Sequence, residues 1–157
     1  MFGKLNDNEI ELLLKNQLIG RIGCHADNTT YVVPISYAYD GTYIYGRTFE
    51  GMKVNIMRKN PRVCFQADYM DNMANWQSVV AWGDYEELTE PAERNKALQL
   101  LSNRELPLIS SETTHLSALW PFMPESTENI KGLVFRIRLV EKTGRYEKNS
   151  VSSKFAF

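Results

Sequence analysis

The sequence has few of the residues that would build a metal centre or a disulfide framework. Cysteine and histidine each occur only twice in 157 residues. Cys24 and His25 are neighbours, so their side chains would point to opposite faces of a strand, and the sequence holds no other cluster of these two residue types. We therefore expect no metal site. Cys24 and Cys64 are expected to stay reduced and to pack as small apolar side chains.

A membrane-spanning run and a strong charge of one sign are also missing. No apolar segment is long enough to cross a bilayer, and the polar N-terminus does not have the pattern of a signal peptide. We therefore expect a cytoplasmic protein with no membrane partner. The net charge of −1 argues against a general nucleic-acid binder. No Ser/His/Asp set or pair of carboxylates stands out, so any reactivity is expected to come from a bound cofactor.

The composition that is present, 43% hydrophobic and 24% charged, is that of a globular protein. We predict one domain over residues 1–147 and a polar tail over 148–157. Segments with strand patterns outnumber those with helix patterns, which favours a closed or nearly closed antiparallel barrel with flanking helices. Strands are predicted at 20–26, 30–39, 43–47, 62–67, 76–88 and 131–142, and helices at 7–16, 52–59 and 90–101.

The segment 30–39 has the clearest strand pattern. Its odd positions are large and its even positions, such as Pro34 and Ser36, are small, so the two faces of the strand must differ. The large face is expected to build the core. The small face could form a wall for a flat ligand, or equally an exposed or dimer-facing side. Pro34 indicates a sheet edge or a bulge, and Asp40-Gly41 predicts a tight hairpin to the next strand.

The segment 42–65 is predicted to form a strand, a loop, a short helix and a strand. Gly51 allows a sharp turn or a close backbone approach, and Lys53 falls in the first turn of the helix. A helix N-terminus with a lysine in its first turn suits an anion, especially a phosphate. The alternative is a basic helix that faces solvent. Asn60-Pro61 ends the helix, because the residue before a proline avoids the α region.

Two polar segments, 68–75 and 102–129, are predicted as loops. A loop as long as 102–129 is usually functional or partly mobile. His115 lies within it and is more often a surface residue than a catalyst. Trp120 lies there too and is more often a packing anchor than a lid over a ligand.

Five motifs together resemble the flavin-binding split barrels related to pyridoxamine 5'-phosphate oxidase, in the branch that includes the 5-nitroimidazole resistance proteins. The motifs are YVVPIS (31–36), GMK (51–53), NPRVCF (60–65), WQSVVAWG (76–83) and FRIRLVEKTGR (135–145). They cover most of the chain in the order found in the family. The resemblance implies a mainly β fold with flanking helices, a split antiparallel β-barrel, and FMN held at the interface of a homodimer.

The resemblance also implies which residues contact the cofactor. Lys53 matches the phosphate-binding lysine of the family, while Met52 stands where the family often has arginine. Arg47 is expected to supply the missing charge, Trp120 to come from the partner subunit, and residues 33–36 to run beside the flavin ring and its ribityl chain. The predicted cofactor-binding residues are Val33, Pro34, Ile35, Ser36, Arg47, Thr48, Met52, Lys53, Ser78 and Trp120.

Two departures from the family pattern bear on the activity. The Trp-Arg and Arg-x-His elements of true pyridoxamine phosphate oxidases are not found, so vitamin B6 oxidation is not expected. No histidine ends the strand 43–47, where nitroimidazole reductases usually have one, so nitroimidazole is expected to be a poor substrate.

The expected function is that of an FMN-dependent oxidoreductase, with a small organic substrate and NAD(P)H as electron donor. The alternative is a non-catalytic flavin carrier or sensor. A deazaflavin could replace FMN. A small barrel that binds single-stranded nucleic acid is a third possibility, which the charge balance disfavours.

Overall fold

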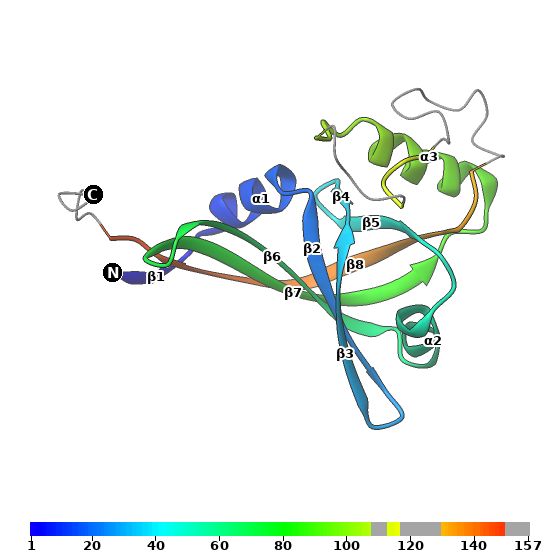
Figure 1. The fold of residues 1–157 in the computed structure, drawn as a ribbon, viewed down its shortest axis with the longest axis horizontal. Helices are drawn as coiled ribbons and strands as arrows, with labels where there is room; N and C mark the ends of the chain where they lie inside the picture. Colours follow the sequence, from blue (N-terminus) through cyan, green and yellow to red (C-terminus); the bar gives the residue numbers. More distant parts are fainter. Residues whose placement is uncertain (108–112, 117–129, 150–157) are drawn as a thin grey trace.

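The computed structural model describes residues 1–107, 113–116 and 130–149. Within these ranges the chain forms eight strands and three helices (Figure 1). In chain order they are β1 (Phe2–Lys4), α1 (Asp7–Asn16), β2 (Ile19–Ala26), β3 (Thr29–Ser36), β4 (Ala38–Tyr39), β5 (Tyr43–Thr48), α2 (Met52–Lys59), β6 (Arg62–Asn72), β7 (Asn75–Glu87), α3 (Pro91–Ser102) and β8 (Leu133–Glu147).

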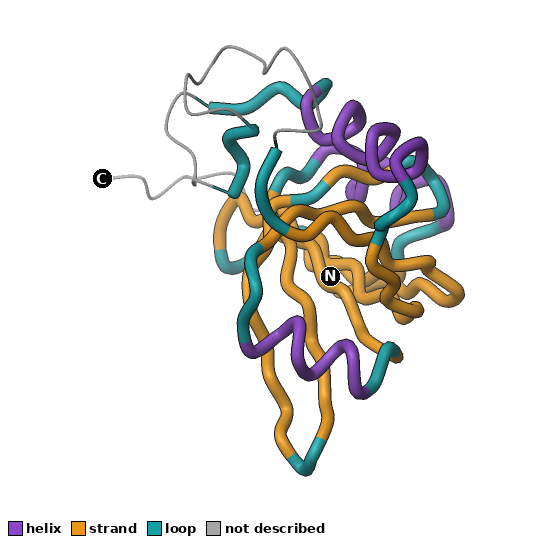
Figure 2. The backbone as a smooth tube through the Cα atoms, turned by 90° about the vertical axis from the view of Figure 1, so that its right-hand side faces the viewer, coloured by secondary structure: helices purple, strands orange, loops and turns teal. Residues whose placement is uncertain are grey.

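All these strands belong to one antiparallel sheet. Its order is β3-β2-β6-β7-β8-β5-β4, and β1 pairs with β8. The two end strands, β3 and β4, are separated in the chain only by Tyr37, so the sheet must curl to bring its ends together (Figure 2). β3 contacts β5, but no ladder among the described residues joins them. The fold is therefore a split antiparallel β-barrel with flanking helices, which confirms the predicted fold class.

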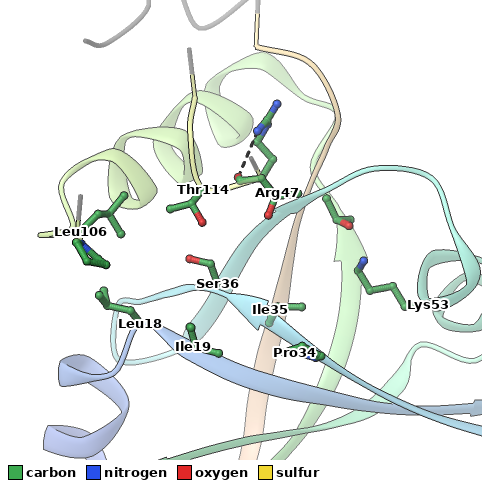
Figure 3. Close-up of a pocket in the computed structure, with 12 residues that line it drawn as sticks. Leu18, Ile19, Pro34, Ile35, Ser36, Arg47, Lys53, Leu106 and Thr114 are labelled. Atoms are coloured by element: carbon green, nitrogen blue, oxygen red, sulfur yellow. Dashed lines mark hydrogen bonds between the residues drawn. The ribbon is translucent and has the colours of Figure 1, made fainter. Parts of the chain in front are cut away.

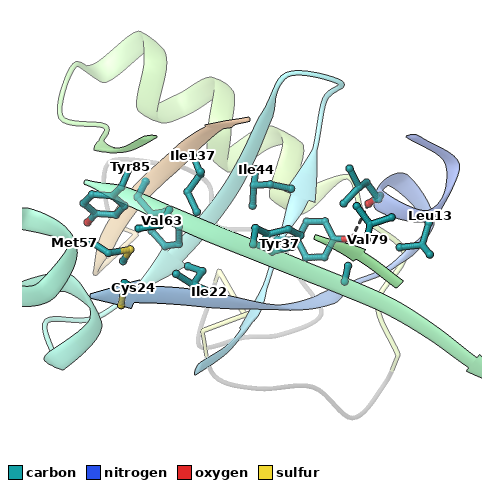
Figure 4. Packing of buried hydrophobic residues seen from close by; sticks show 14 of the residues in the cluster. Leu13, Ile22, Cys24, Tyr37, Ile44, Met57, Val63, Val79, Tyr85 and Ile137 are labelled. Carbon is teal, nitrogen blue, oxygen red and sulfur yellow. Dashed lines mark hydrogen bonds between the residues drawn. The ribbon is translucent and has the colours of Figure 1, made fainter. Parts of the chain in front are cut away.

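Two apolar clusters hold the helices on the curled sheet. The larger joins the inside of the sheet to α1 and α2 (Figure 4), and its largest fully buried members, Tyr37, Phe65 and Phe135, are at most 1% exposed. The smaller lies beneath α3 and contains Leu98, from the helix, and Tyr45, from β5. Apolar side chains recur at every second position of the strands, as the period of a strand requires.

The helices begin and end close to the predicted residues because their termini carry local signals. Asn6 and Glu9 form a reciprocal capping box at the start of α1. Pro91 occupies the first turn of α3, where its missing N–H has no helical partner to lose. Helix α2 spans the predicted residues and stops before Pro61. Of the helices described here, none has the length and apolar character needed to cross a membrane.

The predicted strand 30–39 is in fact two strands, and the break occurs at Tyr37. The Tyr37 backbone N–H donates to the carbonyl of Leu18, and its hydroxyl donates to the carbonyl of Leu14 at 2.7 Å. Because these contacts turn the chain, β3 pairs with β2 and β4 pairs with β5. Pro34 lies on the edge strand β3, as predicted.

Several strands extend beyond their predicted bounds. Most of the predicted loop 68–75 belongs to β6 and β7, with only a short turn between the strands. Likewise β8 continues through Gly144 to Glu147, and it pairs with a short N-terminal strand, β1, that was not predicted. The polar composition of 68–75 predicted a loop, but most of these residues form strand because β7 pairs with β6 along one edge and with β8 along the other. The pairing of β7 with β8 is interrupted by a register shift between Trp82 and Gly83.

Candidate functional site

A cavity of about 450 Å³ lies where the barrel is split (Figure 3). Its walls come from the end of β3, from β5, from the first turn of α2 and from the segment that follows α3. The described residues that line it are Leu18, Ile19, Pro34, Ile35, Ser36, Arg47, Thr48, Lys53, Leu106, Pro107, Thr113 and Thr114. Two of these carry positive charge and none is acidic, so the cavity favours an anionic ligand.

The fold brings six of the ten predicted cofactor-binding residues into this cavity. They are Pro34, Ile35, Ser36, Arg47, Thr48 and Lys53. Three elements supply them, β3, β5 and α2, which lie close together in the chain with only the short strand β4 between β3 and β5. The hairpin at residues 40–42 sets β5 beside β4, and the turn after β5 places the start of α2 near the edge strand.

Lys53 is the functional group at one end of the cavity. Figure 3 shows it at the far side of the cavity from Leu18 and Leu106. Among the described residues the Lys53 ammonium has no hydrogen-bond or ion-pair partner, although the side chain is half-buried. Burial lowers the pKa of Lys53, and the nearby Cys24 partly opposes this effect. A partly desolvated cation without a counter-charge is well placed to bind a phosphate.

The start of α2 adds backbone donors beside Lys53. No side chain caps this helix, because its N-cap residue is Gly51. Gly51 lies in the bend between β5 and α2 with an extended φ of 176°, and no close backbone approach is found there among the described residues, because a Cβ would meet nothing within 4 Å. The helix N-terminus is therefore open among the described residues, and its first N–H groups can reach an anion.

Arg47 lines the cavity but also fastens one of its walls. Its Nε donates to the carbonyl of Lys131 at 2.6 Å, and its Nη1 donates to the carbonyls of Thr113 and His115 at 3.2 and 3.1 Å. The guanidinium also lies 5.2 Å from the ring centroid of Phe49. Burial lowers the pKa of Arg47, and the nearby Arg94 adds to this effect. Arg47 thus ties two distant segments to β5.

The other predicted residues lie elsewhere. Val33 is on β3 but does not line the cavity, and Met52 begins α2 with a side chain that is 51% exposed. Ser78 lies on β7, where its hydroxyl accepts a hydrogen bond from Gln66 at 3.1 Å. Trp120 lies outside the described residues.

The sequence predicts a functional loop at 102–129 but does not identify the residues there that line the cavity. Leu106, Pro107, Thr113 and Thr114 line the cavity, and Arg104 reaches it through a hydrogen bond to Ser36. No periodicity marks this part of the chain, so local pattern could not have identified these residues. Their place depends on where α3 ends relative to β3.

Comparison with known proteins gives relatives of similar fold. A crystal structure of an FAD-binding protein from Mesorhizobium loti is 30% identical, with a TM-score of 0.72 over 94% of this chain and 99% of that one. A candidate 5-nitroimidazole antibiotic resistance protein from Bacteroides thetaiotaomicron shares the fold at 16% identity, with a TM-score of 0.69 over 93% and 87% of the two chains.

A curated relative and a family profile complete the comparison. An uncharacterized protein from Rhizobium meliloti is 39% identical over 70 residues, a match that covers 45% of this chain and about half, 46%, of the relative. A sequence profile described as pyridoxamine 5'-phosphate oxidase matches residues 6–146. The match covers nearly the whole barrel and confirms the resemblance seen in the five motifs. The chain therefore belongs to the pyridoxamine 5'-phosphate oxidase family.

Proposed function

We propose that this protein is a flavoprotein that binds FMN in the cavity at the split of the barrel. The observation that carries the proposal is Lys53, a half-buried cation with no partner among the described residues, at one end of that cavity. The phosphate would lie at Lys53 and the N-terminus of α2. The flat ring would lie toward Ile35, Leu18 and Leu106, where the lining is apolar. The FAD-binding relative from Mesorhizobium loti supports a flavin as ligand.

The residues present fit such a cofactor in charge, chemistry and size. Lys53 and Arg47 supply positive charge, and no acidic side chain among the described lining would repel a phosphate. Thr48 adds a hydroxyl beside them, which in this structure donates to the carbonyl of Phe49 at 3.4 Å. The volume of about 450 Å³ lies within the range of pockets that bind small molecules, roughly 300–1,000 Å³.

We further propose that the protein is an oxidoreductase with a small organic substrate and NAD(P)H as electron donor. A bound flavin supplies the hydride and electron transfer that side chains alone cannot perform. The described lining holds no histidine, cysteine or carboxylate, so the chain itself would bind and orient the reactants. A carrier or sensor would use the same site without turnover, and only kinetics separates the two.

We propose that a second copy of the chain completes the site. β3 is an edge strand, and Val32 on it is 65% exposed, while Ile19 on the neighbouring β2 is 56% exposed at the cavity wall. A partner subunit would bury these apolar side chains and cover the open side of the cavity. Trp120 of the partner remains the predicted contact.

A titration tests the cofactor assignment. The apoprotein is mixed with FMN, FAD and a deazaflavin in turn, while ligand fluorescence and absorbance are followed. We expect FMN to bind with quenched fluorescence and shifted absorption bands. Tighter binding of FAD or of the deazaflavin would replace FMN in the proposal, and no binding of any of the three would refute it.

Anaerobic stopped-flow then tests the reaction class. The bound flavin is mixed with NADH or NADPH, and the reduced protein is mixed with a quinone, a nitroimidazole or oxygen. We expect reduction by one nicotinamide and slow reoxidation by a small oxidant. If neither nicotinamide reduces the flavin, the carrier or sensor function is supported instead. Fast, saturable reoxidation by the nitroimidazole would show that the histidine missing from β5 is not required.

A further inference from the structure

Arg104 is a partly buried arginine at the end of the cavity away from Lys53. It follows α3 in the chain, and its Nε donates to the carbonyl of Leu101 at 2.8 Å, in the last turn of that helix. Its Nη1 donates to the hydroxyl of Ser36 at 2.6 Å and to the carbonyl of Tyr37 at 2.9 Å. Arg104 thus joins α3 to the point where β3 ends and the barrel is split.

The charge of Arg104 lacks an ionic partner within the described residues. No described carboxylate forms an ion pair with its guanidinium, and burial lowers the pKa of Arg104 to about 10. Carbonyl and hydroxyl dipoles offset the cost of burying the charge only in part. Negative charge on a ligand close to Arg104 would therefore be stabilised.

Ser36 connects Arg104 to the cavity, because its hydroxyl both lines the cavity and accepts a hydrogen bond from Arg104. The Ser36 side chain points from its strand into the cavity (Figure 3). Because its oxygen accepts from Arg104, its own O–H is left to donate, and it donates to no acceptor among the described residues. A hydroxyl that accepts a hydrogen bond from a cation is a stronger donor than a hydroxyl without such a partner, because hydrogen bonds in a chain strengthen one another.

We propose that Ser36, positioned by Arg104, donates a hydrogen bond to the flavin ring and stabilises the negative charge that the ring carries when reduced. The inference rests on the proposed flavin function. With the phosphate at Lys53, the ring must extend along the cavity toward Ile35 and Ser36. Reduction adds two electrons and one proton to a neutral ring, so the ring gains one negative charge. Ser36 would therefore bind the reduced ring more tightly than the oxidised ring and raise its reduction potential.

The test compares the reduction potentials of FMN bound to the wild type and to four variants. Ser36→Ala removes the donor and leaves Arg104 in place, whereas Ser36→Thr keeps the hydroxyl. Arg104→Gln removes the charge, and Arg62→Gln is the matched control, since Arg62 is exposed on β6 and does not line the cavity. The potential is measured by spectroelectrochemical titration, and circular dichroism shows that each variant is folded.

We expect Ser36→Ala to weaken binding of the reduced ring relative to the oxidised ring by about tenfold, which lowers the two-electron potential by about 30 mV. Arg104→Gln should lower the potential at least as much, while Ser36→Thr and Arg62→Gln should stay close to the wild type. An unchanged potential in Ser36→Ala, or an equal fall in Ser36→Thr, would overturn the role of the hydroxyl. If the wild type binds no flavin, the proposed function itself is refuted. That result can be told apart from failure of the Ser36 proposal, because it is obtained with the wild type alone. If Arg104→Gln does not fold, the two Ser36 variants still decide the question.

Discussion

Arg47 and Lys131 are 84 residues apart in the chain, yet the guanidinium Nε of Arg47 donates to the backbone carbonyl of Lys131 at 2.6 Å. The same side chain donates to two carbonyls in residues 113–115. Arg47 was predicted as a second clamp for a phosphate, but three of its contacts hold the protein's own backbone. Phosphate recognition in the proposed site therefore depends mainly on Lys53, and Arg47 mainly keeps the cavity wall in place.

We predict that Arg47→Met lowers the free energy of unfolding by about 2 kcal/mol, because hydrogen bonds to a charged group are worth roughly 1.5–3 kcal/mol each and this site is only part-buried. Urea unfolding followed by tryptophan fluorescence measures the loss. Arg62→Met is the control, since the Arg62 side chain forms an exposed ion pair with Asp84, and its loss should change stability by about 0.5 kcal/mol or less. Equal stability of Arg47→Met and the wild type would show that these contacts contribute nothing.

We predict that Lys53→Ala weakens FMN binding by about ten- to a hundredfold, as the loss of one charge-assisted hydrogen bond implies. Riboflavin lacks the phosphate, so its affinity should change far less. Lys59→Ala is a matched control, because Lys59 lies at the other end of α2, where it is exposed and pairs with Asp27. Fluorescence titration of each variant with both ligands gives the affinities. Equal losses for FMN and riboflavin would contradict the phosphate role of Lys53.

FMN affinity should also depend on pH through Lys53. Burial lowers the pKa of Lys53 in the ligand-free protein, and a bound phosphate would raise that pKa again. FMN should therefore bind best while Lys53 is protonated, and affinity should fall as the pH rises through the lowered pKa. Affinity should fall on the acid side as well, below the second pKa of the phosphate near about 6. The affinity for riboflavin, measured over the same pH range, should show neither the acid nor the alkaline fall. Identical pH profiles for the two ligands would exclude a role of Lys53 protonation in phosphate binding.

We predict a homodimer in solution. Light scattering at micromolar concentration, with FMN bound, should give about twice the chain mass of 18.1 kDa. Val32→Asp would place a charge on the exposed edge strand and should shift the dimer toward monomer, because burying an unpaired carboxylate in an interface is costly. A mass near 18.1 kDa for the wild type with FMN bound would refute the shared site.

Local patterns were sufficient for much of the fold. Strands β7 and β8 show more buried and more exposed residues in alternation, and helices α1 and α3 carry capping residues. Both features involve residues a few positions apart, so the sequence alone reveals them. Long-range partners overruled local pattern in two places. The predicted strand 30–39 is broken at Tyr37, whose hydroxyl donates to the carbonyl of Leu14 in α1. Most of the polar segment 68–75 forms strand, because β7 pairs with both of its neighbours.

The sequence by itself determined the fold class and the placement of Lys53 in the first turn of α2, because strand alternation and helix termini are local properties. Only the tertiary structure decided which side chains share the cavity. Ser36 and Arg104 are 68 residues apart and belong to segments with no common pattern. They meet because the sheet curls and splits after β3, just where α3 ends. A contact of this kind depends on how the whole sheet bends, which no local spacing of residues encodes.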